Sequence, residues 1–324
     1  MSKQTQIVVL TAPDEPDLPG LEALGGQARV RYARDESVLR ETLPAADILV
    51  VTDFRTDWLR EVWPREHHIS WVHATSAGVD ALMFPELTES DIILTNARGI
   101  FDRGIAEYVL GAVLLFAKDT LGNLDYQRQH RWRHRETELI HKQTALVVGA
   151  GSIGREVAAL LRAVGMRVIG TARHAREDER FDAVYGEDAL DELLPSADYV
   201  VITAPLTPRT EGLFDRSAFE RMQSGARLIN VGRGPIVKLD ALIEALRNGQ
   251  IDGAALDVFE QEPLPADSPL WDMPNVMISA HMAGDFIGWR RALGEQFVEN
   301  FRRWVAGSPM LNVVEKKRGY ISAK

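Results

Sequence analysis

The stretch at residues 147–160, VVGAGSIGREVAAL, decides the fold of this chain. It places Gly149, Gly151 and Gly154 in a G-x-G-x-x-G pattern between an apolar run and an amphipathic segment. The first glycine of such a turn allows a tight reversal, the second lets the backbone approach a pyrophosphate, and the third lets helix and strand pack closely. A helix that begins near Ser152 would direct its unpaired N–H groups and its positive dipole end at that pyrophosphate. We therefore predict a dinucleotide-binding turn, with a glycine turn that binds no ligand as the alternative.

The end of the next predicted strand bears on which dinucleotide is bound. An NAD-specific site has an Asp or Glu about 20 residues after the glycines, where it bonds the ribose 2'-hydroxyl. Here the strand ends VIGTARHAR, so Thr171 or Ala172 occupies the acid position and Arg173 follows. Arginine binds a 2'-phosphate, which a carboxylate would repel. We predict NADP(H) as the preferred cofactor and NAD(H) as the second one. In the alternative, Arg173 is a surface residue and the site accepts either.

The composition excludes several other classes of protein. The chain has 324 residues, no cysteine and a formal net charge of −10. Without cysteine there is no disulfide, thiolate nucleophile or Cys-based metal site, and we predict no metal. The negative charge provides no basic field for nucleic acid, and the arginines of residues 128–135 lie beside Glu136 and Glu138. No apolar stretch approaches the roughly 18 residues of a membrane span, and no signal sequence stands at the start, so we expect a cytoplasmic protein with no membrane partner.

Short apolar runs alternate with amphipathic stretches, which is the pattern of a mostly parallel α/β sheet. The length exceeds what one hydrophobic core usually holds, so we expect two doubly wound domains. The first predicted strands are IVVLTA from Ile7, ARVRYA from Ala28, DILVVT from Asp47, SWVHAT from Ser70 and IILTN from Ile92. The second set is TALVVGA from Thr144, RVIGTA from Arg167, YVVITA from Tyr199, ARLINV from Ala226, GAALDV from Gly253 and VMISAH from Val276. Between the sets we expect an apolar helix over residues 105–120 and an arm or long connection over residues 124–140.

Three polar side chains follow predicted strands of the second set. His281 closes VMISAH, Arg233 follows LINV, and Glu262 comes shortly after GAALDV. Open parallel sheets bind ligands at the carboxyl ends of their strands. A lone histidine is usually structural, but an arginine and a glutamate at the same sheet edge favour a catalytic site.

The motifs form a set that belongs together. They are VVGAGSIGREVA, ITAPLTPRTEGL, INVGRGPIV, AALDVFEQEPLP and SAHMAG, with the weaker HATSAGVD and IAEYVL. This set resembles the D-isomer-specific 2-hydroxyacid dehydrogenases, and most closely the glyoxylate/hydroxypyruvate reductases. The resemblance implies an NAD(P)-dependent oxidoreductase that reduces a small 2-oxo acid to the D-2-hydroxy acid. It also implies a flavodoxin-like substrate domain of residues 1–100 and 286–324, an inserted Rossmann cofactor domain of residues 101–285, and a homodimer formed through a helix and arm at about residues 101–140.

The same resemblance assigns roles to individual residues. His281 would donate a proton to the substrate carbonyl, Glu262 would bond its other ring nitrogen and favour the charged imidazole, and Arg233 would bind the substrate carboxylate and carbonyl. The backbone N–H groups of Ser76, Ala77 and Gly78 would hold the carboxylate. The expected cofactor-binding residues are Gly149, Gly151, Ser152, Ile153, Gly154, Arg173, Pro205, Thr210, Val231 and Asp257. For Asp257 the alternative is a cap on the loop after its strand.

The sequence leaves open the substrate, the place of Trp132 and two alternative functions. His281 is followed by Met-Ala-Gly-Asp, where the family more often has small and hydroxyl residues, so the identity of the acid is not determined. Trp132 either reaches a neighbouring subunit's pocket or packs on its own surface. A dinucleotide-sensing regulatory protein on the same fold is the alternative from another class, and a dehydrogenase for phosphoglycerate, phosphite or formate is the alternative within the family.

Overall fold

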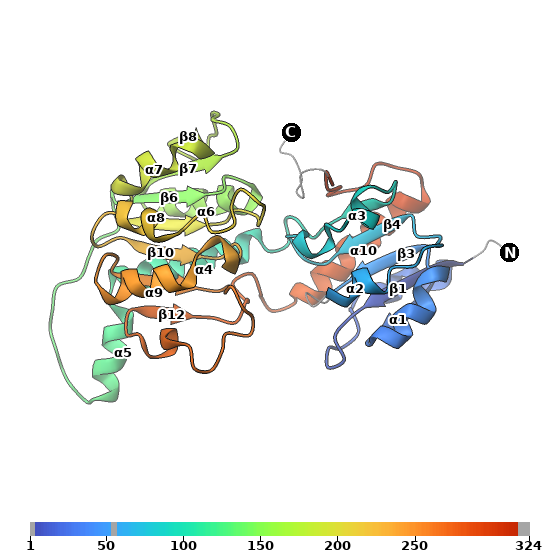
Figure 1. Cartoon of the computed structure of the whole chain (residues 1–324), viewed down its shortest axis with the longest axis horizontal. Coiled ribbons are helices and arrows are strands. Elements are labelled where there is room, and N and C mark those ends of the chain that lie inside the picture. Colours follow the sequence, from blue (N-terminus) through green and yellow to red (C-terminus); the bar gives the residue numbers. More distant parts are fainter. Residues whose placement is uncertain (1–3, 53–56, 317–324) are drawn as a thin grey trace. The chain divides into compact units, whose positions relative to one another are not determined.

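The computed structural model describes residues 4–52 and 57–316. The chain divides into two compact units (Figure 1). Unit 1 comprises Met1–Phe101 and Phe286–Lys324, and unit 2 comprises Asp102–Asp285. Each unit has a parallel sheet and a hydrophobic core of its own, which confirms the predicted fold class of two doubly wound α/β domains.

The sheet of unit 1 has the strand order β2-β1-β3-β4-β5, with parallel pairing throughout. Its strands are β1 (Thr5–Leu10), β2 (Ala28–Ala33), β3 (Ile48–Val51), β4 (Trp71–Ala74) and β5 (Ile93–Thr95). Its helices are α1 (Glu36–Thr42), α2 (Asp57–Glu61), α3 (Pro85–Thr88) and α10 (Trp289–Val305), with 3₁₀ helices at Leu21–Gln27, Leu43–Ala45 and Asp80–Leu82. Helix α10 returns to this unit from the far end of the chain, and its Phe297 stacks on the buried Trp71 with ring centroids 5.0 Å apart.

The sheet of unit 2 has the order β12-β11-β10-β9-β6-β7-β8, also parallel. Its strands are β6 (Thr144–Val148), β7 (Arg167–Ala172), β8 (Ala183–Gly186), β9 (Tyr199–Ile202), β10 (Arg227–Asn230), β11 (Gly253–Leu256) and β12 (Val276–Ile278). Its helices are α4 (Asp102–Ala117), α5 (Thr120–Arg128), α6 (Ser152–Ala163), α7 (Leu190–Leu193), α8 (Arg216–Arg221) and α9 (Leu239–Arg247), with 3₁₀ helices at Glu187–Ala189, Leu194–Ser196, Gly234–Ile236 and Pro269–Asp272. The strand order reverses between β6 and β9, which is where ligands of such sheets bind.

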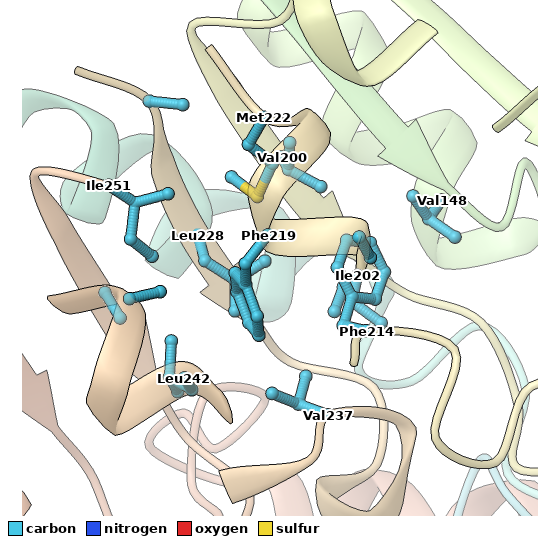
Figure 2. Packing of buried hydrophobic residues seen from close by; sticks show 14 of the residues in the cluster. Val148, Val200, Ile202, Phe214, Phe219, Met222, Leu228, Val237, Leu242 and Ile251 are labelled. Atoms are coloured by element: carbon cyan, nitrogen blue, oxygen red, sulfur yellow. The ribbon is translucent and has the colours of Figure 1, made fainter. Parts of the chain in front are cut away.

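Helices α8 and α9 cover one face of the unit 2 sheet. Figure 2 shows Phe219 of α8 and Leu242 of α9 beside the strand residue Leu228, in a cluster whose members are almost fully buried. A side chain buried to this extent stabilises the fold by roughly 1.5–3 kcal/mol. This packing holds the strands rigidly, so the loops at their carboxyl ends have fixed starting points.

All eleven predicted strands are present, and two elements differ from the prediction. Strand β8 was not predicted, because it is a four-residue edge strand with only one buried residue, Val184. The predicted arm begins later than expected, because residues up to Arg128 form helix α5. Helix α5 starts at Asp119, whose side chain accepts a hydrogen bond from the Gly122 N–H, and none of its residues is buried. A helix without a buried face has no apolar periodicity to reveal it.

The most apolar helix is α4, which spans 16 residues. At 1.5 Å per residue it would be about 24 Å long, short of the roughly 30 Å of a bilayer core. Within residues 4–52 and 57–316, no helix is long and apolar enough to cross a membrane.

Candidate active site

The glycine turn follows β6 and begins α6, and two of its glycines are required by close packing. Gly149 has φ +109, and a Cβ atom there would lie 2.7 Å from the Ala204 backbone nitrogen. A Cβ atom on Gly154 would lie 2.2 Å from the carbonyl oxygen of Gly149 and 3.0 Å from the Thr203 hydroxyl. A side chain at position 149 would push the turn away from the loop after β9, and one at position 154 would separate α6 from the turn and from β6.

Gly151 differs from the other two glycines, because a Cβ atom there would meet nothing within 4 Å. It precedes the first turn of α6, and no side chain caps the N–H groups of that turn. Ser152 donates its hydroxyl hydrogen bond to Asp102 at the start of α4, and Ile153 is half-buried. Open space above uncapped amides suits a pyrophosphate, so the turn fits the predicted dinucleotide.

Arg173 is exposed and lies directly after β7, where it forms no hydrogen bond or ion pair with the described residues and is available to a ligand. Arg176 is committed elsewhere: it donates to the carbonyl of Ala150 in the glycine turn and lies 3.6 Å from Asp178. The Asp178 side chain is 1% exposed and also pairs with Arg155, at 3.2 Å. Arg173 is therefore the arginine of this loop that is left for a 2'-phosphate.

Hydrogen bonds of the Thr210 hydroxyl stabilise the loop after β9. Its hydroxyl donates to the Pro205 carbonyl over 2.7 Å and accepts from the Thr207 N–H over 2.9 Å. These bonds occupy the Thr210 side chain, so a ligand along this loop would meet mostly backbone atoms. Val231, after β10, is 7% exposed and its N–H bonds the Ile202 carbonyl over 3.2 Å.

His281 and Glu262 come together at the carboxyl end of the unit 2 sheet. His281 Nδ1 lies 2.8 Å from Glu262 Oε2, and the two side chains are 32% and 36% exposed. Partial burial raises the pKa of Glu262. Hydrogen bonds from His281 and the Phe259 N–H, and the positive charges of His281 and Arg233, lower it by more, so the pKa lies below its usual value. The carboxylate therefore stays ionised, and with Nδ1 bound to it the ring directs Nε2 outward.

Arg233 follows β10 on a loop that two glycines bring close to neighbouring backbone. A Cβ atom on Gly234 would lie 1.8 Å from the Phe259 carbonyl, and one on Gly232 would lie 2.9 Å from the Ala204 carbonyl. The first approach places the Arg233 loop against the loop of Glu262. Arg233 itself donates to the Gly232 carbonyl over 2.8 Å and is half-buried.

The carboxylate of Asp257 is used within the protein. It is 3% exposed and accepts hydrogen bonds from Ser279 Oγ at 2.5 Å, the Met282 N–H at 2.9 Å and the Ala283 N–H at 2.9 Å. This arrangement caps the loop that carries His281. Sequence reasoning missed Ser279, although its place two residues before His281 at a strand end was a usable signal.

The turn of Ser76, Ala77 and Gly78 follows β4 in unit 1. The Ser76 hydroxyl donates to the Gly78 carbonyl over 2.6 Å, and Asn96 Nδ2 donates to the Ala77 carbonyl over 2.5 Å. All three residues are half-buried. These hydrogen bonds use the carbonyls of Ala77 and Gly78 and the Ser76 hydroxyl.

Known proteins resemble this chain over most of its length. Residues 110–283 match the family described as D-isomer specific 2-hydroxyacid dehydrogenase, NAD binding domain. Glyoxylate/hydroxypyruvate reductase B of Klebsiella pneumoniae subsp. pneumoniae is 34% identical over 292 residues, covering 86% of this chain and 88% of that protein.

Solved structures agree with this match. A D-isomer specific 2-hydroxyacid dehydrogenase from Xanthobacter autotrophicus Py2, in complex with NADPH and MES, has a TM-score of 0.85 and 34% identity over 98% of this chain and 100% of that one. An NADPH-dependent glyoxylate/hydroxypyruvate reductase from Sinorhizobium meliloti, in complex with NADP and sulfate, has a TM-score of 0.85 and 30% identity with the same coverage. This chain belongs to the D-isomer specific 2-hydroxyacid dehydrogenase family, and it is an NAD(P)-dependent oxidoreductase.

Proposed function

We propose that this protein reduces a small 2-oxo acid of the glyoxylate or hydroxypyruvate kind to the D-2-hydroxy acid, with NADPH preferred over NADH. The observation that carries the proposal is the pair of His281 Nδ1 and Glu262 Oε2 at 2.8 Å, beside the Arg233 loop. The relatives named above are reductases or dehydrogenases of such acids and two were crystallised with NADPH or NADP, which supports both parts.

The chemistry follows from what these side chains can hold and donate. When bound, NADPH supplies the hydride that reduces the substrate carbonyl. His281 donates a proton from Nε2 to the carbonyl oxygen, because Nδ1 is engaged by Glu262. The ionised Glu262 stabilises the imidazolium before transfer. Arg233 binds the substrate carboxylate through its planar guanidinium, and the N–H groups of residues 76–78 in unit 1 add further donors.

The remaining site residues hold the cofactor in this proposal. The amides at Gly151, Ser152 and Ile153 bind the pyrophosphate, and Arg173 binds the 2'-phosphate. The other proposed cofactor contacts are Pro205, Thr210 and Val231. For Asp257 we propose the alternative, a cap on the loop after its strand, in place of a nicotinamide-side contact. Unit 2 is thus the cofactor domain and unit 1 the substrate domain.

We also propose a homodimer in the cytoplasm, formed through the segment that follows α4. Helix α5 has no buried residue, Trp132 is 100% exposed and Leu139 is 76% exposed. In Figure 1, α5 projects beyond the sheet of unit 2. The segment is anchored where Glu138 pairs with Arg227 at 2.5 Å, so its exposed apolar side chains are held in place for a second copy.

The experiment follows loss of NADPH absorbance, and separately NADH absorbance, with glyoxylate, hydroxypyruvate, pyruvate, a branched-chain 2-oxo acid and phenylpyruvate. Chiral chromatography of the product separates the D from the L hydroxy acid. Faster turnover with NADPH and a D product are the expected results. Tight NADPH binding without turnover on any acid would contradict the proposal and favour the dinucleotide-sensing alternative.

A further inference from the structure

A chain of hydrogen bonds connects helix α4 to the loop that carries His281. The hydroxyl of Tyr108, on α4, lies 2.7 Å from Ser279 Oγ, and Ser279 donates over 2.5 Å to Asp257 Oδ1. Asp257 is buried, and the other two residues are half-buried. This series of hydrogen bonds thus ends on the carboxylate that caps the His281 loop.

The donors available in this series of hydrogen bonds determine which group donates in each bond. A carboxylate accepts only, so the single hydroxyl hydrogen of Ser279 points to Asp257, and Tyr108 must be the donor to Ser279. Burial raises the pKa of Tyr108 to about 12, and the phenol therefore keeps its proton at any pH at which the protein would work. Hydrogen bonds in series polarise one another, so the loss of the first weakens the second.

Asp257 holds three consecutive N–H groups of the loop. Its backbone carbonyl accepts from His281 over 2.8 Å, and its two carboxylate oxygens accept from Met282 and Ala283 over 2.9 Å each. His281 depends on this grip because its φ is +52, a left-handed conformation that residues other than glycine keep only where the surroundings enforce it. If the carboxylate turned away, the N–H groups of Met282 and Ala283 would lose their acceptors, and the loop directly after His281 could shift the ring away from Glu262.

We propose that Tyr108 is a positioning residue for His281, acting through Ser279 and the Asp257 carboxylate. In this proposal Tyr108 acts on His281 through its hydrogen bond to Ser279. Its hydroxyl fixes the orientation of the carboxylate, and the carboxylate fixes the backbone from which the His281 ring projects. The inference rests on the proposed function for the role of His281 as proton donor.

The first test is the Tyr108→Phe variant, which removes one oxygen atom. We expect kcat at saturating NADPH and 2-oxo acid to fall about threefold to tenfold, the effect of one net hydrogen bond, while KM for NADPH stays within about twofold. Tyr199→Phe is the matched control, because Tyr199 is a buried tyrosine of unit 2 whose hydroxyl bonds the Val113 carbonyl of α4, at 3.4 Å, rather than the His281 loop. An unchanged kcat in Tyr108→Phe, or an equal loss in the control, would overturn the proposal.

A double-mutant cycle tests the route. Because Tyr108 acts only through Ser279, Tyr108→Phe should lower kcat no further once Ser279→Ala is present. Ser279→Thr, which keeps a hydroxyl, should retain most of the parent's kcat. Additive losses would overturn the route through Ser279. If Tyr108→Phe does not fold, the comparison of Ser279→Ala with Ser279→Thr still tests the link, and equal losses of kcat in these two variants would overturn it.

Amide hydrogen exchange separates this inference from the proposed function. The peptide of residues 279–285 should exchange faster in Tyr108→Phe than in the parent and in Tyr199→Phe. That result in a protein that reduces no 2-oxo acid would contradict the proposed function and leave the hydrogen-bonded chain standing. Equal exchange in all three folded proteins would overturn the inference whatever the parent catalyses.

Discussion

Units 1 and 2 share one architecture and differ at the turn after the first strand of each. In unit 2, β6 runs into the glycines at 149, 151 and 154, and α6 starts at once. In unit 1, β1 runs into TAPDEPDLP, which has no glycine and carries three acidic residues at positions 14–17. Bulky side chains and negative charge would both exclude a pyrophosphate. The same sheet therefore serves either role, and the turn decides which unit binds a dinucleotide.

Two histidines extend this comparison. His73 lies inside β4 of unit 1 and is 0% exposed, with Nδ1 on the Thr95 hydroxyl at 2.8 Å. His281 lies beyond the end of β12 in unit 2, with a third of its side chain exposed and a carboxylate on Nδ1. A histidine within a strand is part of the core, whereas one past a strand end can reach a substrate.

The largest expected effect comes from replacing His281, the histidine that lies beyond a strand end. His281→Ala should lower kcat by about a hundredfold to ten-thousandfold, because it removes the proton donor. The urea unfolding midpoint should stay close to that of the parent, since the side chain is partly exposed. His68→Ala, at an exposed position of unit 1, is the control. Turnover within about tenfold of the parent would mean that His281 is not the acid.

The second-largest expected effect is on NADPH affinity, when a methyl group is added to a glycine of unit 2 and, for comparison, to a glycine of unit 1. Gly151→Ala should fold normally, because its φ of −83 suits alanine and the added methyl meets nothing within 4 Å. Its Kd for NADPH, from fluorescence titration, should rise by about 30-fold to 100-fold, since the methyl would displace a charged pyrophosphate from the amides. Gly26→Ala in unit 1 also meets nothing within 4 Å and is the matched control. Equal affinities in the two variants would show that the pyrophosphate does not bind at this turn.

Much of the fold could be predicted because its signals are local. Most of the eleven predicted strands are short apolar runs between turn residues, because burial on both faces keeps such runs free of polar positions. Strand β2 instead alternates apolar residues with Arg29 and Arg31, because it is an edge strand. Strand β8 lies at the sheet edge with one buried residue, and helix α5 has no buried face, so neither carried that signal. Trp132 is fully exposed, so it does not pack on the surface of its own subunit, which was the other prediction for this residue.

The site could be predicted in part, for a related reason. Strand ends of one parallel sheet converge, which is why Glu262 and His281 were expected together and lie 2.8 Å apart. Tyr108 and Ser279 are separated by 171 positions in the chain, and only the packing of α4 on the sheet brings their hydroxyls together. The left-handed backbone of His281 is equally invisible in the sequence, because hydrogen bonds to Asp257 impose it.

His73, the buried histidine of unit 1, should affect the free energy of unfolding rather than turnover. Burial lowers the pKa of His73 to about 3, while in the unfolded chain it lies near 6.5. Above pH 6.5 the residue is neutral in both states and contributes no pH dependence. Between pH 6.5 and 3 only the unfolded state binds the proton, so the free energy of unfolding should fall by about 1.4 kcal/mol, or tenfold in the unfolding constant, per pH unit.

Urea unfolding at pH 7.5 and 5.5 measures this slope. His73→Gln should lose the part of the slope that the buried imidazole causes, while His68→Gln, at an exposed position of the same unit, should keep it. Carboxylates that titrate in the same range affect parent and variants alike, so the difference between the two slopes isolates His73. Parallel slopes in all three proteins would show that His73 takes up a proton without unfolding unit 1.

The smallest expected effect concerns the arginine that distinguishes the two cofactors. Arg173→Ala should raise KM for NADPH about fivefold to tenfold and leave KM for NADH within about twofold, because only NADPH carries the 2'-phosphate. Arg167→Ala is the matched control, since Arg167 is an exposed arginine at the opposite end of the same strand, β7. Arg176 would be a poor substitute, because it is bound to the Ala150 carbonyl and its removal would disturb the glycine turn as well. An equal rise for both cofactors in Arg173→Ala would place this side chain on the shared part of the dinucleotide, and the NADPH preference would then need another donor in unit 2.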